Sequence, residues 1–91
     1  MRVRFTREAL AHIAGIRSYI AGYSPRAADR VADRIFAETD RLGEFPRLGR
    51  SGQVSGTCEW TVPGLPYIIV YQSGRAEGFV VLGVFHGAQC R

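Results

Sequence analysis

Hydrophobic residues recur along the first half of the chain with two different periods. Residues 2–6 alternate polar and apolar side chains, which predicts a short half-buried strand. Thr6 then suits the N-cap of a helix that runs to about Gly22. The apolar residues of this helix recur at helical spacing and share one face: Ala9, Ile13, Ile16, Ile20 and Tyr23.

A second helix is predicted directly after the first. Ser24 and Pro25 form a start signal, a hydroxyl cap followed by proline at the first helical position. We expect this helix to run to about Leu42 and to be closed by Gly43. Its expected buried face consists of Ala28, Val31, Ala32, Ile35, Thr39 and Leu42. Because the link between the helices is short, they should form an antiparallel hairpin.

Three strands are expected after a loop over residues 45–52. They cover residues 54–62, 65–72 and 78–86, with turns at Pro63-Gly64 and Ser73-Gly74. Their short connections predict an antiparallel meander. The sequence therefore predicts one domain, residues 1–91, of the α+β class with the order β-α-α-β-β-β. In it, a helical hairpin packs on one face of an antiparallel sheet.

The last two strands are apolar on both faces. Simple alternation separates Tyr67, Ile69 and Tyr71 from Ile68 and Val70, and Phe79, Val81 and Phe85 from Val80, Leu82 and Val84. A helical hairpin covers only one face of such a sheet, so the second face is left as an apolar surface. Either the loop over residues 45–52 folds across it, or a partner segment lies across the sheet or adds to its edge. We expect the partner.

Charge and composition narrow the kind of partner. The chain has 91 residues with twelve basic side chains, all arginine, and eight acidic ones, a formal net charge of +4. This balance fits an acidic partner, either nucleic acid or an acidic protein segment, although a merely solvated basic surface has the same composition. The uncharged run over residues 60–74 is too short to cross a membrane, and the charged N-terminus offers no signal peptide. We therefore expect a cytoplasmic protein.

The two cysteines indicate neither a metal site nor a disulfide. Cys58 and Cys90 lack the paired spacing of a zinc site, and a single disulfide is unusual in the cytoplasm. Cys58 should lie in a strand and Cys90 in an exposed tail. No metal and no cofactor are expected.

The order and spacing of several short motifs resemble those of the RelE/ParE toxins of bacterial toxin–antitoxin pairs, most closely the ParE-like branch. The motifs span nearly the whole chain: Ala27-Ala28, Arg30, Ile35, Leu42, Pro46, Gly49-Arg50, Gly52, Val54, Gly56-Thr57, Glu59, residues 66–71 and residues 84–89. The resemblance implies the fold predicted above. It also implies a toxin neutralised by a cognate antitoxin, whose flexible, acidic C-terminal segment wraps the toxin. The antitoxin's N-terminal part binds DNA, so the toxin meets DNA only indirectly.

The resemblance offers three modes of action. ParE-like toxins are linked to inhibition of DNA gyrase, without known catalysis by the toxin. RelE-like toxins are ribosome-dependent mRNA endonucleases, but this sequence has Ile68 where the RelE pattern has arginine, and Glu59 and Thr61 near the positions of its lysines. The tyrosine expected near the C-terminus is also missing. The third possibility is a relic that binds antitoxin only, because Cys58 stands where ParE-like toxins often have arginine.

Candidate site residues follow from these expectations. Antitoxin binding is predicted for Leu10, Tyr19, Phe36, Trp60, Val80 and Leu82. For Trp60, core packing is the first expectation and contact with a partner is the alternative. Target binding is predicted for Arg47, Arg50, His86, Gln89 and Arg91. No catalytic residue is predicted, and His86 is the one candidate kept for an acid–base role. We expect Glu59 to form a cross-strand pair and His12 to lie on the surface.

Overall fold

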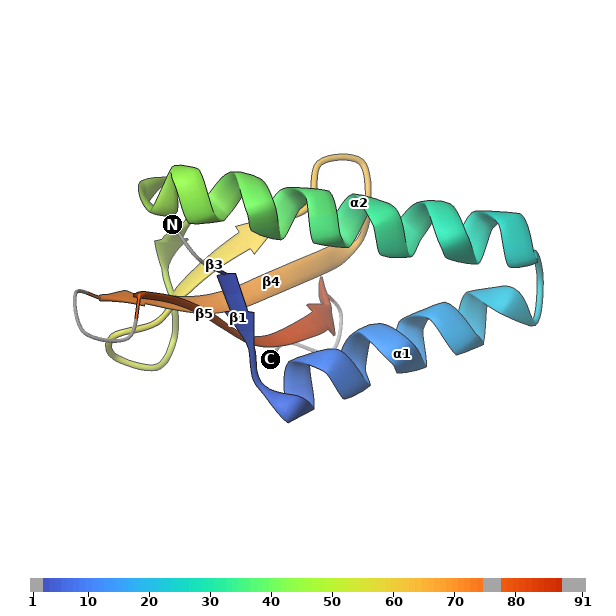
Figure 1. Cartoon of the computed structure of the whole chain (residues 1–91), viewed down its shortest axis with the longest axis horizontal. Helices are drawn as coiled ribbons and strands as arrows, with labels where there is room; N and C mark the ends of the chain where they lie inside the picture. Colours follow the sequence, from blue (N-terminus) through green and yellow to red (C-terminus); the bar gives the residue numbers. More distant parts are fainter. Residues whose placement is uncertain (1–2, 75–77, 88–91) are drawn as a thin grey trace.

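The computed structural model describes residues 3–74 and 78–87. In chain order the elements are β1 (Val3–Phe5), α1 (Arg7–Ala21), α2 (Pro25–Glu44), the short 3-10 helix η1 (Pro46–Leu48), β2 (Arg50–Ser51), β3 (Cys58–Thr61), β4 (Tyr67–Gly74) and β5 (Gly78–His86). The predicted order of elements is confirmed, with η1 and β2 added in the segment that we expected to be a loop. Figure 1 shows the helical hairpin packed along one face of the sheet, with its tip reaching beyond the strands.

The sheet is mixed rather than wholly antiparallel. Its strand order is β1-β5-β4-β3-β2, and β1 runs parallel to β5 while the other pairs are antiparallel. The expectation of an antiparallel sheet was wrong at this one edge. The reason is that the helical hairpin carries the chain away from β1, and the last strand then returns beside it in the same direction.

Both helices begin at the predicted caps. The Thr6 hydroxyl accepts a hydrogen bond from the Ala9 N–H at 3.0 Å, and the Ser24 hydroxyl accepts one from the Ala27 N–H at 3.2 Å. The predicted end of α2 was wrong by two residues. Gly43 does not close the helix but is buried inside it, and the helix continues to Glu44.

The core lies between the hairpin and the facing side of the sheet. Its buried members are Ala9, Ile13, Ile35, Leu42, Val62, Tyr67, Ile69, Tyr71, Phe79, Val81 and Val84. Trp60 and Cys58 of β3 pack against this cluster from its rim, so the expected packing of Trp60 and the expected strand position of Cys58 are confirmed.

A bulge in β5 overturns part of the predicted alternation. The register between β4 and β5 shifts between Val70 and Tyr71, so one extra residue of β5 is accommodated near Leu82. Beyond this point every side chain of β5 changes face. Val84 is therefore buried in the core, and Phe85 points to the opposite face, the reverse of the simple pattern.

The strand expected at residues 54–62 is shorter than predicted. Residues 54–57 form a turn in which the N–H and the hydroxyl of Thr57 both donate to the Val54 carbonyl, at 3.1 and 2.6 Å. Within residues 3–74 and 78–87, neither helix has the length and apolar character needed to cross a membrane.

Candidate partner-binding surface

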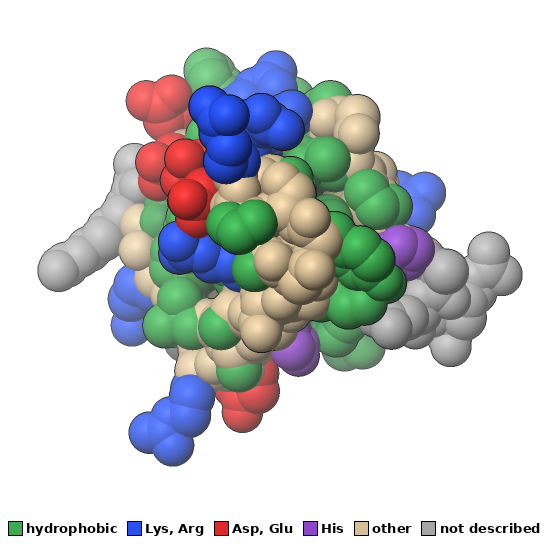
Figure 2. Space-filling view, turned by 90° about the vertical axis from the view of Figure 1, so that its right-hand side faces the viewer, with side chains coloured by type: hydrophobic (Ala, Val, Ile, Leu, Met, Phe, Trp, Pro, Cys, Tyr) green, Lys and Arg blue, Asp and Glu red, His purple; other side chains and the backbone are tan. Residues whose placement is uncertain are grey.

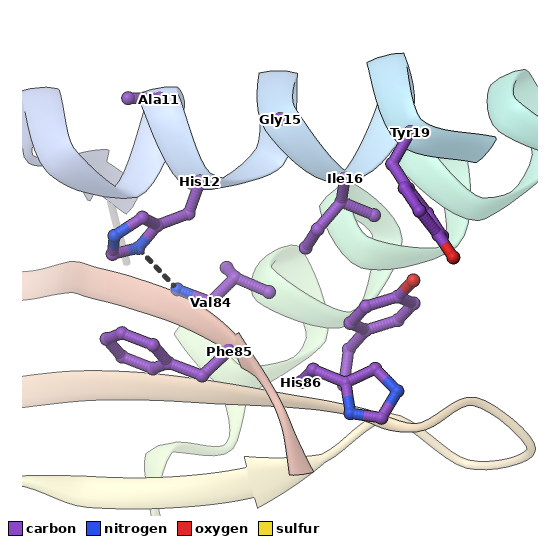
Figure 3. A pocket seen from close by; sticks show the side chains of 9 residues that line it. Ala11, His12, Gly15, Ile16, Tyr19, Val84, Phe85 and His86 are labelled. Atoms are coloured by element: carbon purple, nitrogen blue, oxygen red, sulfur yellow. Dashed lines mark hydrogen bonds between the residues drawn. The ribbon is translucent and has the colours of Figure 1, made fainter. Parts of the chain in front are cut away.

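A cleft opens between α1 and the end of β5. It has a volume of about 780 Å³ and is lined by Ala11, His12, Gly15, Ile16, Tyr19, Tyr67, Val84, Phe85 and His86. Figure 3 shows side chains from α1 and from the strands facing each other across it. Both histidines of the chain reach the molecular surface on this side, with hydrophobic side chains between them (Figure 2). The lining includes neither an arginine nor a carboxylate, so the cleft is apolar with a few hydrogen-bonding groups.

The side of the cleft formed by α1 has a gap near its centre, because Gly15 has no side chain. A Cβ atom built at Gly15 would meet nothing within 4 Å apart from its chain neighbours and the nearby backbone of its own helix. Glycine inside a helix weakens it by about 0.5–1 kcal/mol relative to alanine. At this position, the missing side chain leaves room for the backbone of another segment to approach α1 closely.

His12 closes the edge of the sheet at one end of the cleft. Its Nδ1 atom accepts a hydrogen bond from the Val84 N–H at 3.2 Å, and its ring lies 4.8 Å from that of Phe85. His12 reaches the surface, as expected, but its side chain is half-buried rather than fully exposed. The bulge causes this, because it turns Phe85 toward the imidazole ring.

Aromatic rings line the opposite end of the cleft. The rings of Tyr67 and His86 meet edge to face at 5.7 Å, and those of Tyr19 and Tyr23 do so at 5.5 Å. Hydrogen bonding with Tyr23 raises the pKa of the Tyr19 hydroxyl. Both Tyr19 and Tyr23 are largely exposed, so this end of the cleft presents aromatic surface to a partner.

The sheet face opposite the helices is apolar at its centre. Five half-buried side chains lie on it outside the core cluster and the residues packed against that cluster: Ile68, Val70, Val80, Leu82 and Phe85. We call these five residues the outer sheet patch. Arg4 lies opposite Val80 in β1, and Glu59 lies opposite Val70 in β3, so charged residues border the patch on both sides.

The segment over residues 45–52 does not cover this patch. The Tyr71 hydroxyl, on the helix side of the sheet, donates to the Pro46 carbonyl at 2.6 Å and accepts from the Gly49 N–H at 3.0 Å. These two bonds hold the segment at the end of the core. Of the two covers considered from the sequence, the folded-over loop is therefore excluded for the described residues.

The structure does not bring the predicted antitoxin-binding residues together. Tyr19 lines the cleft, whereas Leu10 lies half a turn around α1 and is exposed, as is Phe36 of α2. Trp60 sits between β3 and α2, where its indole N–H donates to Glu38 at 2.7 Å. Only Val80 and Leu82 share one surface, the outer sheet patch.

The predicted target-binding residues are also dispersed. Arg47 is exposed in η1, and Arg50 of β2 is exposed and lies 3.6 Å from Glu59, so the expected cross-strand pair of Glu59 is confirmed. His86 ends β5 beside the cleft. Gln89, Arg91 and Cys90 lie outside the described residues.

Glu59 and His86 lie on opposite faces of the sheet. Glu59 pairs with Val70 on the outer face, whereas His86 is opposite Tyr67, whose ring belongs to the core face. An acid and a base that act on one phosphodiester must reach the same atoms. These two side chains cannot do so in this fold.

The sequence reasoning missed His12, Gly15, Tyr67 and Phe85 as lining residues. Gly15 carried a usable signal, since an isolated glycine inside a helical pattern often has a packing or functional reason. Phe85 could not be found, because the bulge that turns it outward leaves no mark in the alternation.

Comparison with known proteins identifies the family. The model of the family described as "ParE toxin of type II toxin-antitoxin system, parDE" matches residues 3–90. The chain belongs to the ParE toxin family. It is 39% identical over 88 residues to Y4kP of Sinorhizobium fredii (strain NBRC 101917 / NGR234), which covers 97% of this chain and 90% of that protein.

A second relative and one solved structure agree with this assignment. Toxin RelE2 of Caulobacter vibrioides (strain ATCC 19089 / CIP 103742 / CB 15) is 37% identical over 89 residues, covering 97% of both chains. A chain of the chromosomal ParDE TA system from P. aeruginosa superposes with a TM-score of 0.84 at 20% identity, covering 94% of this chain and 95% of that chain. At that identity, the likeness shows the shared fold. This ParE-family toxin is thus the toxin member of a type II toxin–antitoxin system.

Proposed function

We propose that this toxin is held inactive in the cytoplasm by a cognate antitoxin, and that the free toxin inhibits DNA gyrase by binding rather than by catalysis. The observation that supports it best is the cleft between α1 and β5. It is an apolar recess, open at the surface, in a chain of the ParE toxin family. Recesses of this kind, with a few hydrogen-bonding groups, are typical binding sites.

The antitoxin segment is proposed to follow one continuous path from the cleft to the outer sheet patch. Phe85 belongs to both surfaces, because it lines the cleft and lies opposite Ile68 on the outer face. A segment that passes Gly15 and turns around the edge of β5 at Phe85 reaches Val80 and Leu82 without crossing a helix. In this proposal, the predicted contacts of Tyr19, Val80 and Leu82 belong to one partner.

The charge distribution along the sequence favours an acidic partner. The chain has twelve basic and eight acidic residues. Helix α2 contains four of the basic residues and five of the acidic ones, so eight arginines and three acidic residues lie in the rest of the chain. The positive charge is therefore carried by the parts of the chain outside α2. Charge of opposite sign on the antitoxin would speed association and favour this partner over others.

Binding of gyrase is favoured over cleavage of mRNA. Transesterification at a ribose needs a base, an acid and a cation around one phosphate. The centre of the outer sheet face is apolar instead, and Glu59 and His86 are on opposite faces. The alternative, a ribosome-dependent endonuclease, is kept as an outcome of the test because one relative bears the name Toxin RelE2.

The test uses the purified toxin, its antitoxin and one cleft-filling variant. Gly15→Leu adds a side chain to the lining of the cleft, at a position where a Cβ atom meets nothing within 4 Å, so it should narrow the cleft without disturbing the core. Ala14→Leu, at an exposed neighbouring position that does not line the cleft, is the matched control. We expect the wild type and both variants to inhibit gyrase supercoiling. Antitoxin should restore supercoiling for the wild type and Ala14→Leu, but not for Gly15→Leu.

Each contrary outcome contradicts a different part of the proposal. Unimpaired supercoiling together with cleavage of a defined mRNA on translating ribosomes would establish the endonuclease. Unimpaired supercoiling, intact mRNA and normal antitoxin binding would establish the relic. Full rescue of Gly15→Leu by antitoxin would show that the antitoxin binds elsewhere on the toxin.

A further inference from the structure

The edge of β5 carries a hydrogen bond that the proposed function does not use. β1 pairs with β5 only along residues 79–81, so β5 continues past the end of β1. Side chains from the start of the hairpin replace the missing strand. The Thr6 hydroxyl donates to the Leu82 carbonyl at 3.0 Å. His12 Nδ1 accepts from the Val84 N–H at 3.2 Å, the dashed line in Figure 3.

This arrangement fixes the protonation state of His12. An imidazole nitrogen that accepts an N–H carries no proton, so in this structure the ring is neutral with its proton on Nε2. An imidazolium ion has protons on both nitrogens and donates only. Protonation therefore sets two N–H groups against each other at Val84 and ends the hydrogen bond.

We propose that His12 attaches the edge of β5 to α1 by a hydrogen bond that depends on the protonation state of the imidazole. In its neutral form it ties the β5 edge at Val84 to α1. In its charged form it leaves that edge and widens the cleft, while residues 84–86 stay paired with β4.

Gly83 and Phe85 pack closely against the His12 ring. A Cβ atom on Gly83 would lie 2.7 Å from the Phe85 ring and 3.1 Å from His12 Nδ1, so only glycine permits the three groups to meet. The Phe85 ring then contacts the imidazole at 4.8 Å. Release of His12 therefore removes a ring contact from Phe85, which is the residue shared by the cleft and the outer sheet patch.

No carboxylate lines the cleft to compensate a charged imidazole. The other titratable groups facing the cleft are Tyr19 from α1, Tyr67 from β4 and His86 from β5. Glu8 lies one turn before His12 on α1, is exposed, and does not line the cleft. No negatively charged side chain in the cleft lining therefore stabilises a positive charge on His12.

The experiment measures amide hydrogen exchange of Val84 by NMR in the purified toxin, with the buried helical amide of Ile35 as internal reference. Between pH 7.5 and 5.5 we expect the protection factor of Val84 to fall roughly two- to tenfold, the loss of one ordinary hydrogen bond. His12→Asn keeps an acceptor near the Nδ1 position but does not titrate, so Val84 should stay protected at both values. His12→Phe keeps a ring without an acceptor, and Val84 should be poorly protected at both.

Three results would overturn the proposal. They are equal protection of wild-type Val84 at the two pH values, a fall that persists in His12→Asn, and full protection in His12→Phe. If a His86→Asn variant loses the pH response instead, His86 is the sensor. If His12→Phe does not fold, the comparison of wild type with His12→Asn still decides.

The consequence for the antitoxin rests on the proposed function. Antitoxin affinity should weaken on acidification in the wild type but not in His12→Asn. If the antitoxin binds elsewhere, its affinity will not follow pH, whereas Val84 exchange still will. The two failures are therefore distinguishable.

Discussion

Single side chains decide where the long connection after α2 is placed. Tyr71 has no exposed surface, its ring stacks on Phe79 at 4.9 Å, and its hydroxyl bonds to the backbone of both Pro46 and Gly49. Burial raises the pKa of the Tyr71 hydroxyl, against the smaller lowering effect of the Gly49 N–H. One hydroxyl thus holds an irregular segment against the core.

Replacing Tyr71 with Phe should remove both bonds while the ring stays in place. We expect the free energy of unfolding to fall by about 1–3 kcal/mol, because the Pro46 carbonyl and the Gly49 N–H lose their partner. Urea denaturation measures this loss. A Tyr23→Phe control, at a position 79% exposed, should change stability much less.

The same tyrosine gives an alkaline pH dependence with a definite sign. Because the pKa of Tyr71 is raised in the folded state, its contribution is complete below the unfolded value of 10.0. It is lost as the pH rises through the higher folded value. Wild-type stability should therefore drop at alkaline pH by more than that of Tyr71→Phe. Equal slopes for the two proteins would contradict the assignment.

At the scale of elements, one polar cluster joins β3 to α2. The Trp60 indole N–H donates to Glu38 at 2.7 Å, and the Arg41 guanidinium lies 6.0 Å from the centre of the Trp60 ring. The Arg41–Glu38 separation is 3.9 Å and Arg41 is half exposed, so this ion pair adds little. The indole–carboxylate bond is the main polar contact between the strand and the helix in this cluster.

Glu38→Ala should loosen β3 from α2. We expect a loss of roughly 1.5–3 kcal/mol, the usual value for a hydrogen bond to a charged group, with a change in the fluorescence of the single tryptophan. Glu44→Ala, on the same helix and exposed, is the control. A loss of equal size in the control would show that helix charge, and not the Trp60 bond, is responsible.

The elements also show what the sequence could and could not predict. Local signals were sufficient where one residue fixes a boundary, as at Thr6 and Ser24, and where two short strands alternate beside a turn. They failed where the partner strand decides. The two-residue β2 exists because Arg50 and Ser51 pair with Glu59 and Cys58, and no periodicity can appear in two residues. The bulge likewise depends on how β5 must fit β4, so the exchange of Val84 and Phe85 could not be seen in β5 alone.

At the scale of the molecule, the two faces of the sheet have different structural roles. The helix side carries the core, and the outer side carries five apolar residues that belong to no cluster of buried residues. Stability and partner binding can therefore be changed separately. The cleft shares in both, because Tyr67 and Val84 line it from the core.

Two neighbouring valines of β5 test this separation. Val81→Thr buries a hydroxyl in the core and should cost about 1–3 kcal/mol in unfolding free energy. Val80→Thr makes the same chemical change on the outer face, should cost less than about 0.5 kcal/mol, and should weaken antitoxin binding, measured by calorimetry. Equal destabilisation by the two changes would mean that the outer face is a second core.

The parallel pairing of β1 with β5 has a temporal consequence. β5 lies between β1 and β4 in the sheet, and among the described strands it is the last to be synthesised. Before β5 is synthesised, β1 has no strand to pair with, His12 of α1 has no Val84 N–H to bind, and one side of the cleft is missing. The sheet and the cleft are therefore completed together, and only once β5 has been synthesised.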